Sequence, residues 1–251
     1  YQKFFQETEV DYPQINSNIL QIEDEYYAIA RPKSSSDSIQ RLTTKLNDTG
    51  VDYIELRSLD VNPFQRIGID LDTVHFLEMF LLYCTLKSSP PINNDEIEES
   101  RENDLLVATK GREPGLSLSK NRTKISLQNW ANQILDEMMP IAELLDYKTN
   151  TFTGIISKTR AHIMDPDQTL SGMLLNKVLS EKMSFHELGR TIGEDYKKHY
   201  FSMETSKNSE WSLLEQESAD SIKKQVELEQ ANEQSFKGFV KEYFNESSSD
   251  N

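Results

Sequence analysis

The sequence is poor in cysteine, and its one cysteine, Cys84, cannot form a disulfide framework within the chain. A chain without disulfides fits a reducing compartment, so we expect a cytoplasmic protein. Cys84 lies in the apolar run Phe76–Leu86, where a thiol more often serves as a small buried hydrophobic group than as a nucleophile. We therefore predict a structural role for it.

Basic residues are scarce beside acidic ones. The sequence has 27 Lys and Arg against 42 Asp and Glu, which gives a formal net charge of -15. That charge would repel a phosphate backbone, so we expect no nucleic-acid partner. No apolar run approaches the roughly 20 residues of a membrane-spanning helix, and no signal peptide is visible, so we expect no membrane association. The histidines lie too far apart to share a metal ion.

Several motifs of phosphate binding and nucleophilic catalysis are also missing. The sequence contains no Gly-x-x-x-x-Gly-Lys-Ser/Thr loop, no Gly-x-Gly-x-x-Gly and no Gly-x-Ser-x-Gly. Their absence excludes a P-loop, a dinucleotide-binding fingerprint and a nucleophile elbow. A local basic site for ATP remains compatible with the acidic composition, because net charge says little about one pocket.

The patterning of the chain changes after about residue 65. Short runs rich in Ile, Tyr and Val predict strands within residues 14–30 and 51–61, with a short helix at 39–46. The later periodicity is helical, and Pro140 should kink or divide one of the helices. The expected helices cover residues 71–86, 96–109, 126–146, 155–164, 170–181 and 184–201. The predicted fold class is α+β, with an antiparallel sheet followed by a mainly helical body.

This patterning divides the chain into three expected parts. Residues 1–65 form a strand-rich part, and residues 66–203 form a helical body packed on the sheet. Residues 204–251 form an acidic helical tail with a disordered end, because their apolar positions are sparse and the last residues are Ser, Asp and Asn.

One strand carries the most suggestive polar residues. If it is extended, Tyr53, Glu55 and Arg57 share one face, and Ile54 and Leu56 pack on the other. A carboxylate and a guanidinium about 7 Å apart could reach the same bound cation and phosphate. A solvated charge pair on an exposed sheet face explains the pattern equally simply, and the pattern alone favours that interpretation.

A second stretch, residues 14–23, alternates Gln, Asn and Glu with apolar residues. Such amides suit a small polar substrate and suit an ordinary edge strand equally well. Tyr26, Tyr27 and Arg31 follow, and their hydroxyl and guanidinium groups could bind a carboxylate. The alternative, with tyrosine in the core and arginine at the surface, is the commoner arrangement.

Three blocks of the sequence together resemble one known family. They are Gln14–Asn18 with Leu20–Glu23 and Arg31–Lys33, then Tyr53–Phe64, and finally Gly111–Leu116. In composition, order and spacing they are similar to motifs of the bacterial glutamate–cysteine ligases, and the second block is the most specific. The resemblance covers about residues 12–120 and becomes a general helical likeness beyond.

The resemblance implies a fold and a reaction. It implies the antiparallel sheet portion of a glutamine-synthetase-like ligase funnel, which holds ATP and Mg²⁺ or Mn²⁺. It further implies that L-glutamate and L-cysteine are joined through γ-glutamyl phosphate, the first step of glutathione synthesis. By the same resemblance Glu55 is a metal ligand, Arg57 contacts the transferring phosphoryl group and ATP, and Tyr27 binds the acceptor amino acid.

The family's earlier half, which supplies most of its metal ligands, has no counterpart in this sequence. The chain also begins at Tyr1 without a methionine. We therefore expect the C-terminal half of a ligase, inactive alone, with the missing N-terminal half as its partner. A natural remnant, a non-catalytic helical interaction module and a ligase that uses another amine acceptor remain alternatives.

Overall fold

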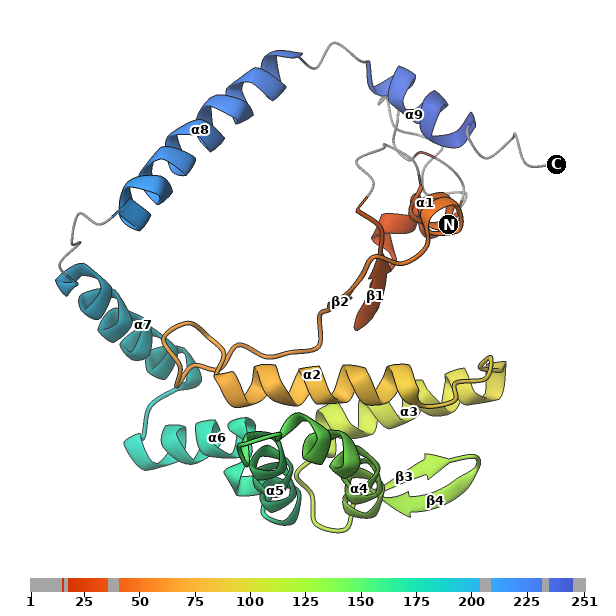
Figure 1. Cartoon of the computed structure of the whole chain (residues 1–251), viewed down its shortest axis with the longest axis vertical. Coiled ribbons are helices and arrows are strands. Elements are labelled where there is room, and N and C mark those ends of the chain that lie inside the picture. Colours follow the sequence, from red (N-terminus) through yellow and green to blue (C-terminus); the bar gives the residue numbers. More distant parts are fainter. Residues whose placement is uncertain (1–14, 16–17, 36–40, 204–208, 232–234, 246–251) are drawn as a thin grey trace. The chain divides into compact units, whose positions relative to one another are not determined.

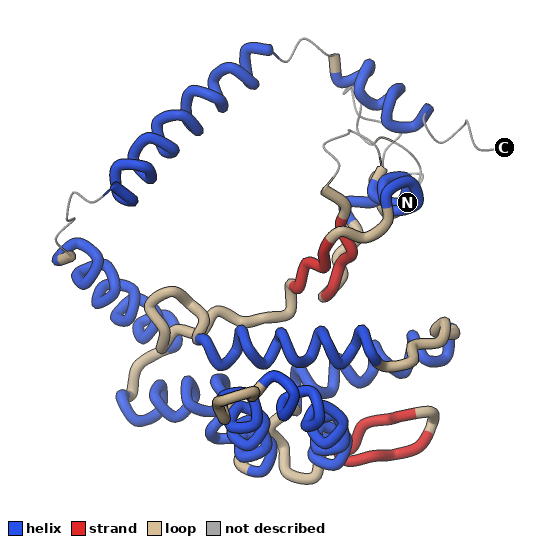
Figure 2. Tube along the Cα trace, viewed as in Figure 1, coloured by secondary structure: helices blue, strands red, loops and turns tan. Residues whose placement is uncertain are grey.

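The computed structural model describes residues 15, 18–35, 41–203, 209–231 and 235–245. The chain separates into two compact units, one made of residues 1–60 with 204–251 and the other of residues 61–203. Figures 1 and 2 show the elements of both units, in which helices predominate and strands form only short hairpins in the part described. This arrangement confirms the α+β class with small antiparallel sheets and a mainly helical body.

Among its described residues, the first unit contains one hairpin and several helices. Its elements are η1 (Glu23–Glu25), β1 (Ala30–Lys33), α1 (Leu42–Thr49), β2 (Tyr53–Leu56), α8 (Ser209–Ala231) and α9 (Phe236–Asn245). Strands β1 and β2 pair antiparallel with Arg31 opposite Glu55. The backbone N–H of Arg57 donates to the carbonyl of Ile29 at 2.8 Å, which extends the ladder beyond the end of β2.

The strand predicted within residues 14–30 begins only at Ala30 in the described chain. Those of the preceding residues that the structure describes include bends and the short 3-10 helix η1. The Gln21 side chain accepts from the Ile15 N–H at 2.7 Å and donates to the Asn18 carbonyl at 2.6 Å. These local bonds fold the segment on itself and compete with a strand ladder.

The second unit is mainly helical. Its elements are α2 (Leu71–Leu86), α3 (Asn94–Lys110), β3 (Ser117–Lys120), β4 (Thr123–Ser126), α4 (Leu127–Leu145), α5 (Thr151–Met164), η2 (Pro166–Gln168), α6 (Leu170–Glu181) and α7 (Phe185–Ser202). Ser126 caps α4 by accepting from the Asn129 N–H at 3.1 Å. Ser184 and Glu187 form a capping box at the start of α7, as the sequence predicts. Helix α4 continues through Pro140 without a division.

The core of this unit lies between α2, α4 and α5. Its buried members are Met79, Tyr83, Leu135, Met138, Ala142, Ile155 and Ile156. A polar tie joins two of these helices at the edge of the core: the Tyr83 hydroxyl donates to the Glu137 carboxylate at 2.5 Å, and Lys87 contacts the same carboxylate. Burial and the bond to Glu137 raise the pKa of the Tyr83 phenol.

The hairpin β3–β4 has no counterpart among the sequence predictions. Its tight turn places Asn121 and Arg122 in the left-handed region, with φ of 53° and 61°. Glu99 of α3 holds this turn, because its carboxylate accepts from both backbone N–H groups at 3.0 and 2.8 Å. Hydrogen bonds from Ser119 and these two amides lower the pKa of Glu99.

Helix α2 is less covered than its composition predicts. A helix with this apolar composition is typically buried on most faces, but the buried residues of α2 are Met79 and Tyr83. Cys84 is exposed, so the prediction that it is buried is wrong for this chain. No helix in the described part of the chain is long and apolar enough to cross a membrane. The three-part division at residues 65 and 204 stays a prediction, and the expected disordered end lies outside the described residues.

Candidate functional site

The three residues that the sequence singles out, Tyr27, Glu55 and Arg57, lie together near the end of strand β2. The Arg57 guanidinium donates from Nε and Nη2 to the two Glu55 carboxylate oxygens, at 2.8 and 3.0 Å. The Tyr27 ring lies beside the same guanidinium, 5.7 Å from ring centroid to Cζ. The Tyr27 hydroxyl donates to the Arg57 carbonyl at 3.4 Å. These three side chains therefore form one cluster.

Lys33 joins this cluster, although the sequence reasoning gave it no site role. Its Nζ lies 3.6 Å from Oε2 of Glu55. The register explains the contact: Arg31 is directly opposite Glu55, so Lys33, two residues further along β1, is the diagonal neighbour on the same face. The Arg31–Lys33 block was visible in the sequence, but only the strand pairing shows which side chain meets Glu55.

The cluster is a partly exposed arrangement of two cations and one anion. Hydrogen bonding to Arg57, with help from the charge of Lys33, lowers the pKa of the Glu55 carboxyl. The same bond to Glu55 raises the pKa of Arg57. The site therefore carries a stable carboxylate and an excess of positive charge, which suits an anionic ligand.

Tyrosine more often lies in the core and arginine at the surface, and here Arg31 and the two tyrosines show the reverse. Arg31 is only 6% exposed, and its Nη2 donates to the carbonyls of Glu23 and Tyr26, each at 3.0 Å. Tyr26 and Tyr27 are exposed. Arg31 thus fixes the turn that leads into β1, and this places Tyr27 beside the charged cluster.

The face of β2 that carries Ile54 and Leu56 is more exposed than we predicted. Ile54 is 53% exposed, so it is not a core residue within this chain, and Leu56 is only half-buried. A two-stranded hairpin with short strands offers too little surface to bury both faces. The prediction that Ile54 packs in a core is therefore wrong here.

The residues described do not form a metal site by themselves. No group of three or more His, Cys, Asp or Glu side chains in the described part of the chain is placed to hold an ion. Glu55 is a single hard oxygen ligand, and its oxygens already contact Arg57 and Lys33. A divalent ion at this site would need further ligands from elsewhere.

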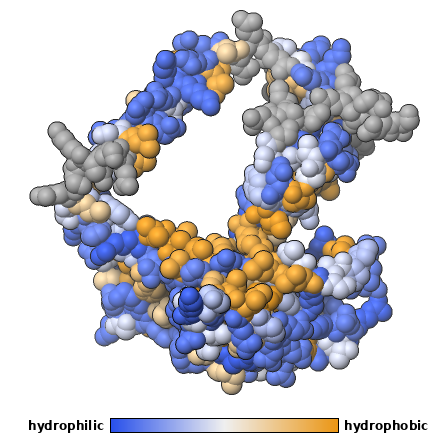
Figure 3. Space-filling model, in the orientation of Figure 1, coloured by the Kyte–Doolittle hydropathy of each residue, from blue (hydrophilic) through white to orange (hydrophobic). Residues whose placement is uncertain are grey.

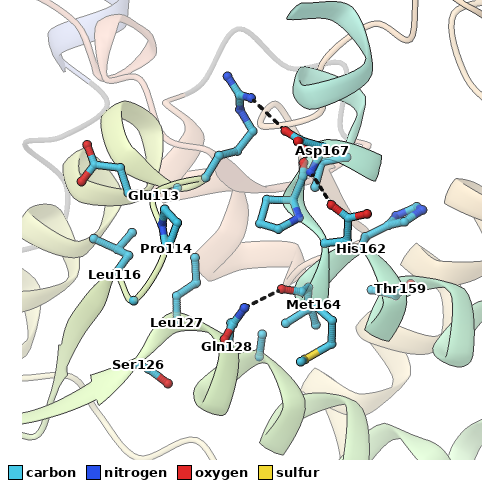
Figure 4. Close-up of a pocket in the computed structure, with 18 residues that line it drawn as sticks. Glu113, Pro114, Leu116, Ser126, Leu127, Gln128, Thr159, His162, Met164 and Asp167 are labelled. Atoms are coloured by element: carbon cyan, nitrogen blue, oxygen red, sulfur yellow. Dashed lines mark hydrogen bonds and ion pairs between the residues drawn. The ribbon is translucent and has the colours of Figure 1, made fainter. Parts of the chain in front are cut away.

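The Gly111–Leu116 block borders a cavity in the second unit (Figure 4). The cavity has a volume of about 620 Å³ and lies between this turn, the start of α4 and the end of α5. Arg112 reaches toward Asp167, with 3.9 Å between Nη1 and Oδ1. Gln128 on the cavity wall donates to the Ile163 carbonyl at 3.1 Å. This block therefore shapes a cavity within the second unit.

Comparisons with known proteins agree with the resemblance seen in the sequence. Residues 1–107 match the family model described as glutamate–cysteine ligase. The glutamate–cysteine ligase of Alcanivorax borkumensis is 35% identical over 239 residues, which are 94% of this chain and 45% of that protein. The glutamate–cysteine ligase of Shewanella oneidensis is 36% identical over 237 residues, with 93% and 45% covered.

A solved structure extends the likeness to three dimensions. The glutamate–cysteine ligase of Francisella tularensis, crystallised in complex with AMP, superimposes with a TM-score of 0.83 at 28% identity. The match covers 94% of this chain and 47% of that one. The chain therefore shares its α+β fold with part of a glutamate–cysteine ligase. The chain is a relative of the proteobacterial glutamate–cysteine ligases, and it spans about half the length of the curated relatives, consistent with a C-terminal half.

Proposed function

We propose that this chain carries one wall of the active site of an ATP-dependent glutamate–cysteine ligase. The observation that supports it is the cluster of Glu55, Arg57 and Lys33 beside Tyr27, in which Glu55 and Arg57 belong to the most specific block of the resemblance. The product would be γ-glutamylcysteine, made from L-glutamate and L-cysteine in the first step of glutathione synthesis. The single cysteine and the use of ATP fit a cytoplasmic enzyme.

The proposed reaction has two steps. A γ-carboxylate oxygen of glutamate attacks the γ-phosphorus of ATP, the bond to the bridging oxygen breaks, and ADP leaves. The cysteine amine then attacks the acyl carbon of γ-glutamyl phosphate, phosphate leaves, and the amine loses a proton. Negative charge shifts over the phosphoryl oxygens in the first step, so stabilisation there depends on positioned cations.

Arg57 is suited to that stabilising role. Its guanidinium is planar and always charged, and it already donates two hydrogen bonds in a fork to Glu55. Two oxygens of a phosphoryl group can accept from a guanidinium in the same bidentate way. Lys33 adds a second cation within 3.6 Å of the same carboxylate. Glu55 therefore holds the arginine side chain in place before ATP binds.

Tyr27 would contact the acceptor amino acid, and Glu55 would contribute one oxygen ligand to Mg²⁺ or Mn²⁺. The remaining metal ligands must come from outside the residues described, because one carboxylate does not hold such an ion. We assign them to a polypeptide equivalent to the rest of the relatives' sequence, here called the complementary half. The chain alone should accordingly be inactive.

A metal titration of the reconstituted enzyme tests the proposal. This chain is mixed with the complementary half of the Alcanivorax borkumensis ligase, and γ-glutamylcysteine formation is followed against Mg²⁺ concentration. Glu55→Gln should raise the half-activating Mg²⁺ concentration at least about tenfold, because a neutral amide is a poor ligand for a hard cation. Asp52→Asn is the matched control, since Asp52 lies just before β2 and accepts from the Ser35 N–H at 2.6 Å. An unchanged Mg²⁺ response for Glu55→Gln would contradict the assignment.

A further inference from the structure

Helix α9 belongs to the first unit together with the β1–β2 hairpin, and its apolar side is covered there. Residues 211–231 of the preceding helix α8 are all exposed, and Figure 3 shows the side of α8 in view as largely hydrophilic. In α9, by contrast, Phe239, Val240 and Phe244 are half-buried and Tyr243 is only 6% exposed. The contacts of α9 with the first unit are therefore made by its own apolar residues.

Two aromatic rings of α9 lie against Arg41, the residue that precedes α1. The Arg41 Cζ is 5.6 Å from the centroid of the Tyr243 ring and 5.3 Å from that of Phe244, which are cation–π distances. Burial raises the pKa of the Tyr243 phenol, and the negative charges of Asp24 and Glu23 raise it as well. The Tyr243 hydroxyl therefore lies near η1, the short helix that contains both carboxylates.

Helix η1 is also tied to α1 and to β1. The Glu23 carboxylate accepts from the N–H and the hydroxyl of Thr43, at 3.1 and 2.8 Å, and so caps the first turn of α1. The carbonyls of Glu23 and Tyr26 accept from Arg31 of β1. Glu23, Tyr26, Arg31 and Tyr243 line one cavity of about 570 Å³. Three separate parts of the chain thus meet at η1, and the cavity beside it leaves room for the segment to shift.

We infer that Tyr243 of α9 is a positioning residue for the acceptor amino acid, and that it acts through η1 on Tyr27. The inference rests on the proposed function, in which Tyr27 contacts the acceptor. Tyr27 lies two residues after the end of η1, with its ring centroid 5.7 Å from the Arg57 Cζ. Removal of the Tyr243 ring enlarges the cavity beside η1, so the segment that leads to Tyr27 is held less firmly. A displaced binding group contacts its substrate less well.

Hydrogen exchange of the chain itself measures whether Tyr243 holds η1. Tyr243→Ala should speed the exchange of backbone N–H groups in residues 23–33 and 41–46 at least about fivefold. Tyr243→Phe keeps the ring and should stay within about twofold of the wild type. Lys241→Ala, at an exposed position of the same helix, is the matched control and should also stay within about twofold. Unchanged exchange in Tyr243→Ala would overturn the inference.

Kinetics of the reconstituted enzyme separate a positioning role from a loss of stability. Tyr243→Ala should raise the KM for cysteine at least about fivefold, with the KM for ATP and kcat changed less than about twofold, and Tyr243→Phe should restore the KM for cysteine. Met138→Ala destabilises the core of the other unit and should leave the KM for cysteine within about twofold.

Two kinetic results would overturn the inference: an unchanged KM for cysteine in Tyr243→Ala, or an equal rise in the KM for cysteine in Met138→Ala. A wild-type mixture that makes no product would instead contradict the proposed function. The hydrogen exchange of Tyr243→Ala would then decide by itself whether α9 positions the segment that leads to Tyr27.

Discussion

The β1–β2 hairpin presents charged side chains to solvent, and the α2–α4–α5 core buries apolar ones. The hairpin and the residue after it carry the charged side chains of Lys33, Glu55 and Arg57 close together, and Ile54 is 53% exposed. The core, in the other unit, buries Met138 and Ile156 completely. Burial of apolar surface is the main source of stability, so the helical core should hold its unit folded, and the hairpin is free to present polar groups. Substitutions in the two regions should therefore affect different measurements.

The largest effect should come from Arg57 in the hairpin. Arg57→Ala should lower kcat of the reconstituted enzyme at least about a hundredfold, because a positioned cation at the transferring phosphoryl is lost. The melting temperature should change little, since the side chain is partly exposed. Arg57→Lys should recover only part of the rate, because a point charge does not reproduce the planar fork. A loss of less than threefold for Arg57→Ala would leave a solvated charge pair as the better account.

The next largest effect should come from the core and should appear in stability. Met138→Ala should lower the free energy of unfolding by about 2–5 kcal/mol, the usual range for a fully buried large side chain. Ile54→Ala should cost less than about 1 kcal/mol because Ile54 is half exposed. Urea titration of the isolated chain measures both values. Equal losses at the two positions would remove the contrast between hairpin and core.

A smaller effect on substrate binding is expected at Tyr27. Tyr27→Phe keeps the ring beside the Arg57 guanidinium and removes only the hydroxyl. We expect the KM for cysteine in the reconstituted enzyme to rise about 3–10-fold with little change in kcat, as for the loss of one hydrogen bond. Steady-state kinetics with each substrate varied in turn checks this. A rise confined to the KM for ATP would reassign the tyrosine.

The smallest effect is expected in the helical unit, at the Asp146 carboxylate. The Asp146 carboxylate accepts from the N–H groups of Phe152 and Thr153 at 2.9 and 2.8 Å, and so caps the start of α5. Partial burial opposes ionisation, but the bonds from Thr153 and Phe152 outweigh it and hold the pKa of Asp146 at about 2, below its ordinary 3.8. Because its pKa is lower in the folded state, the ionised Asp146 carboxylate stabilises the fold fully at pH values above 3.8. This stabilisation is lost as pH falls through about 2.

Asp146→Asn tests this contribution. At neutral pH the variant should melt about 2–4 °C below the wild type, in line with loss of a helix cap. The difference should shrink as pH falls from about 4 to about 2, because the wild-type carboxylate protonates. Asp104→Asn, at an exposed position of α3, is the control and should shift melting by less than about 1 °C. A difference that does not depend on pH would contradict the role of the ionised cap.

The sequence located the elements whose signals are local. Residues 71–86 and 170–181 form helices with the expected bounds, because caps such as Asp70 and Thr169 lie next to the helices that they start. The hairpin β3–β4 was missed, since its turn depends on Glu99, more than twenty residues earlier in the chain. The exposure of Cys84 was missed because the apolar composition of α2 does not tell which sides have partners in this chain.

The candidate site was predictable in part for the same reason. Alternation along one strand put Glu55 and Arg57 on a common face, and the structure places them in direct contact. Lys33 joins them only through the register of β1 with β2, which is a long-range property that the pattern of one strand does not contain. Arg31 is buried because two backbone carbonyls satisfy its guanidinium, and that turn could not be read from residue types.

Reconstitution tests the central claim most directly, namely that this chain supplies one wall of a two-part active site. ATP-dependent formation of γ-glutamylcysteine is measured for this chain alone, for the Alcanivorax complementary half alone, and for the two mixed. Product should form only in the mixture, and its rate should fall when Arg57→Ala replaces the wild-type chain. Product from this chain alone at turnover numbers of about 1 s⁻¹ or more, which are typical of enzymes, would contradict the account.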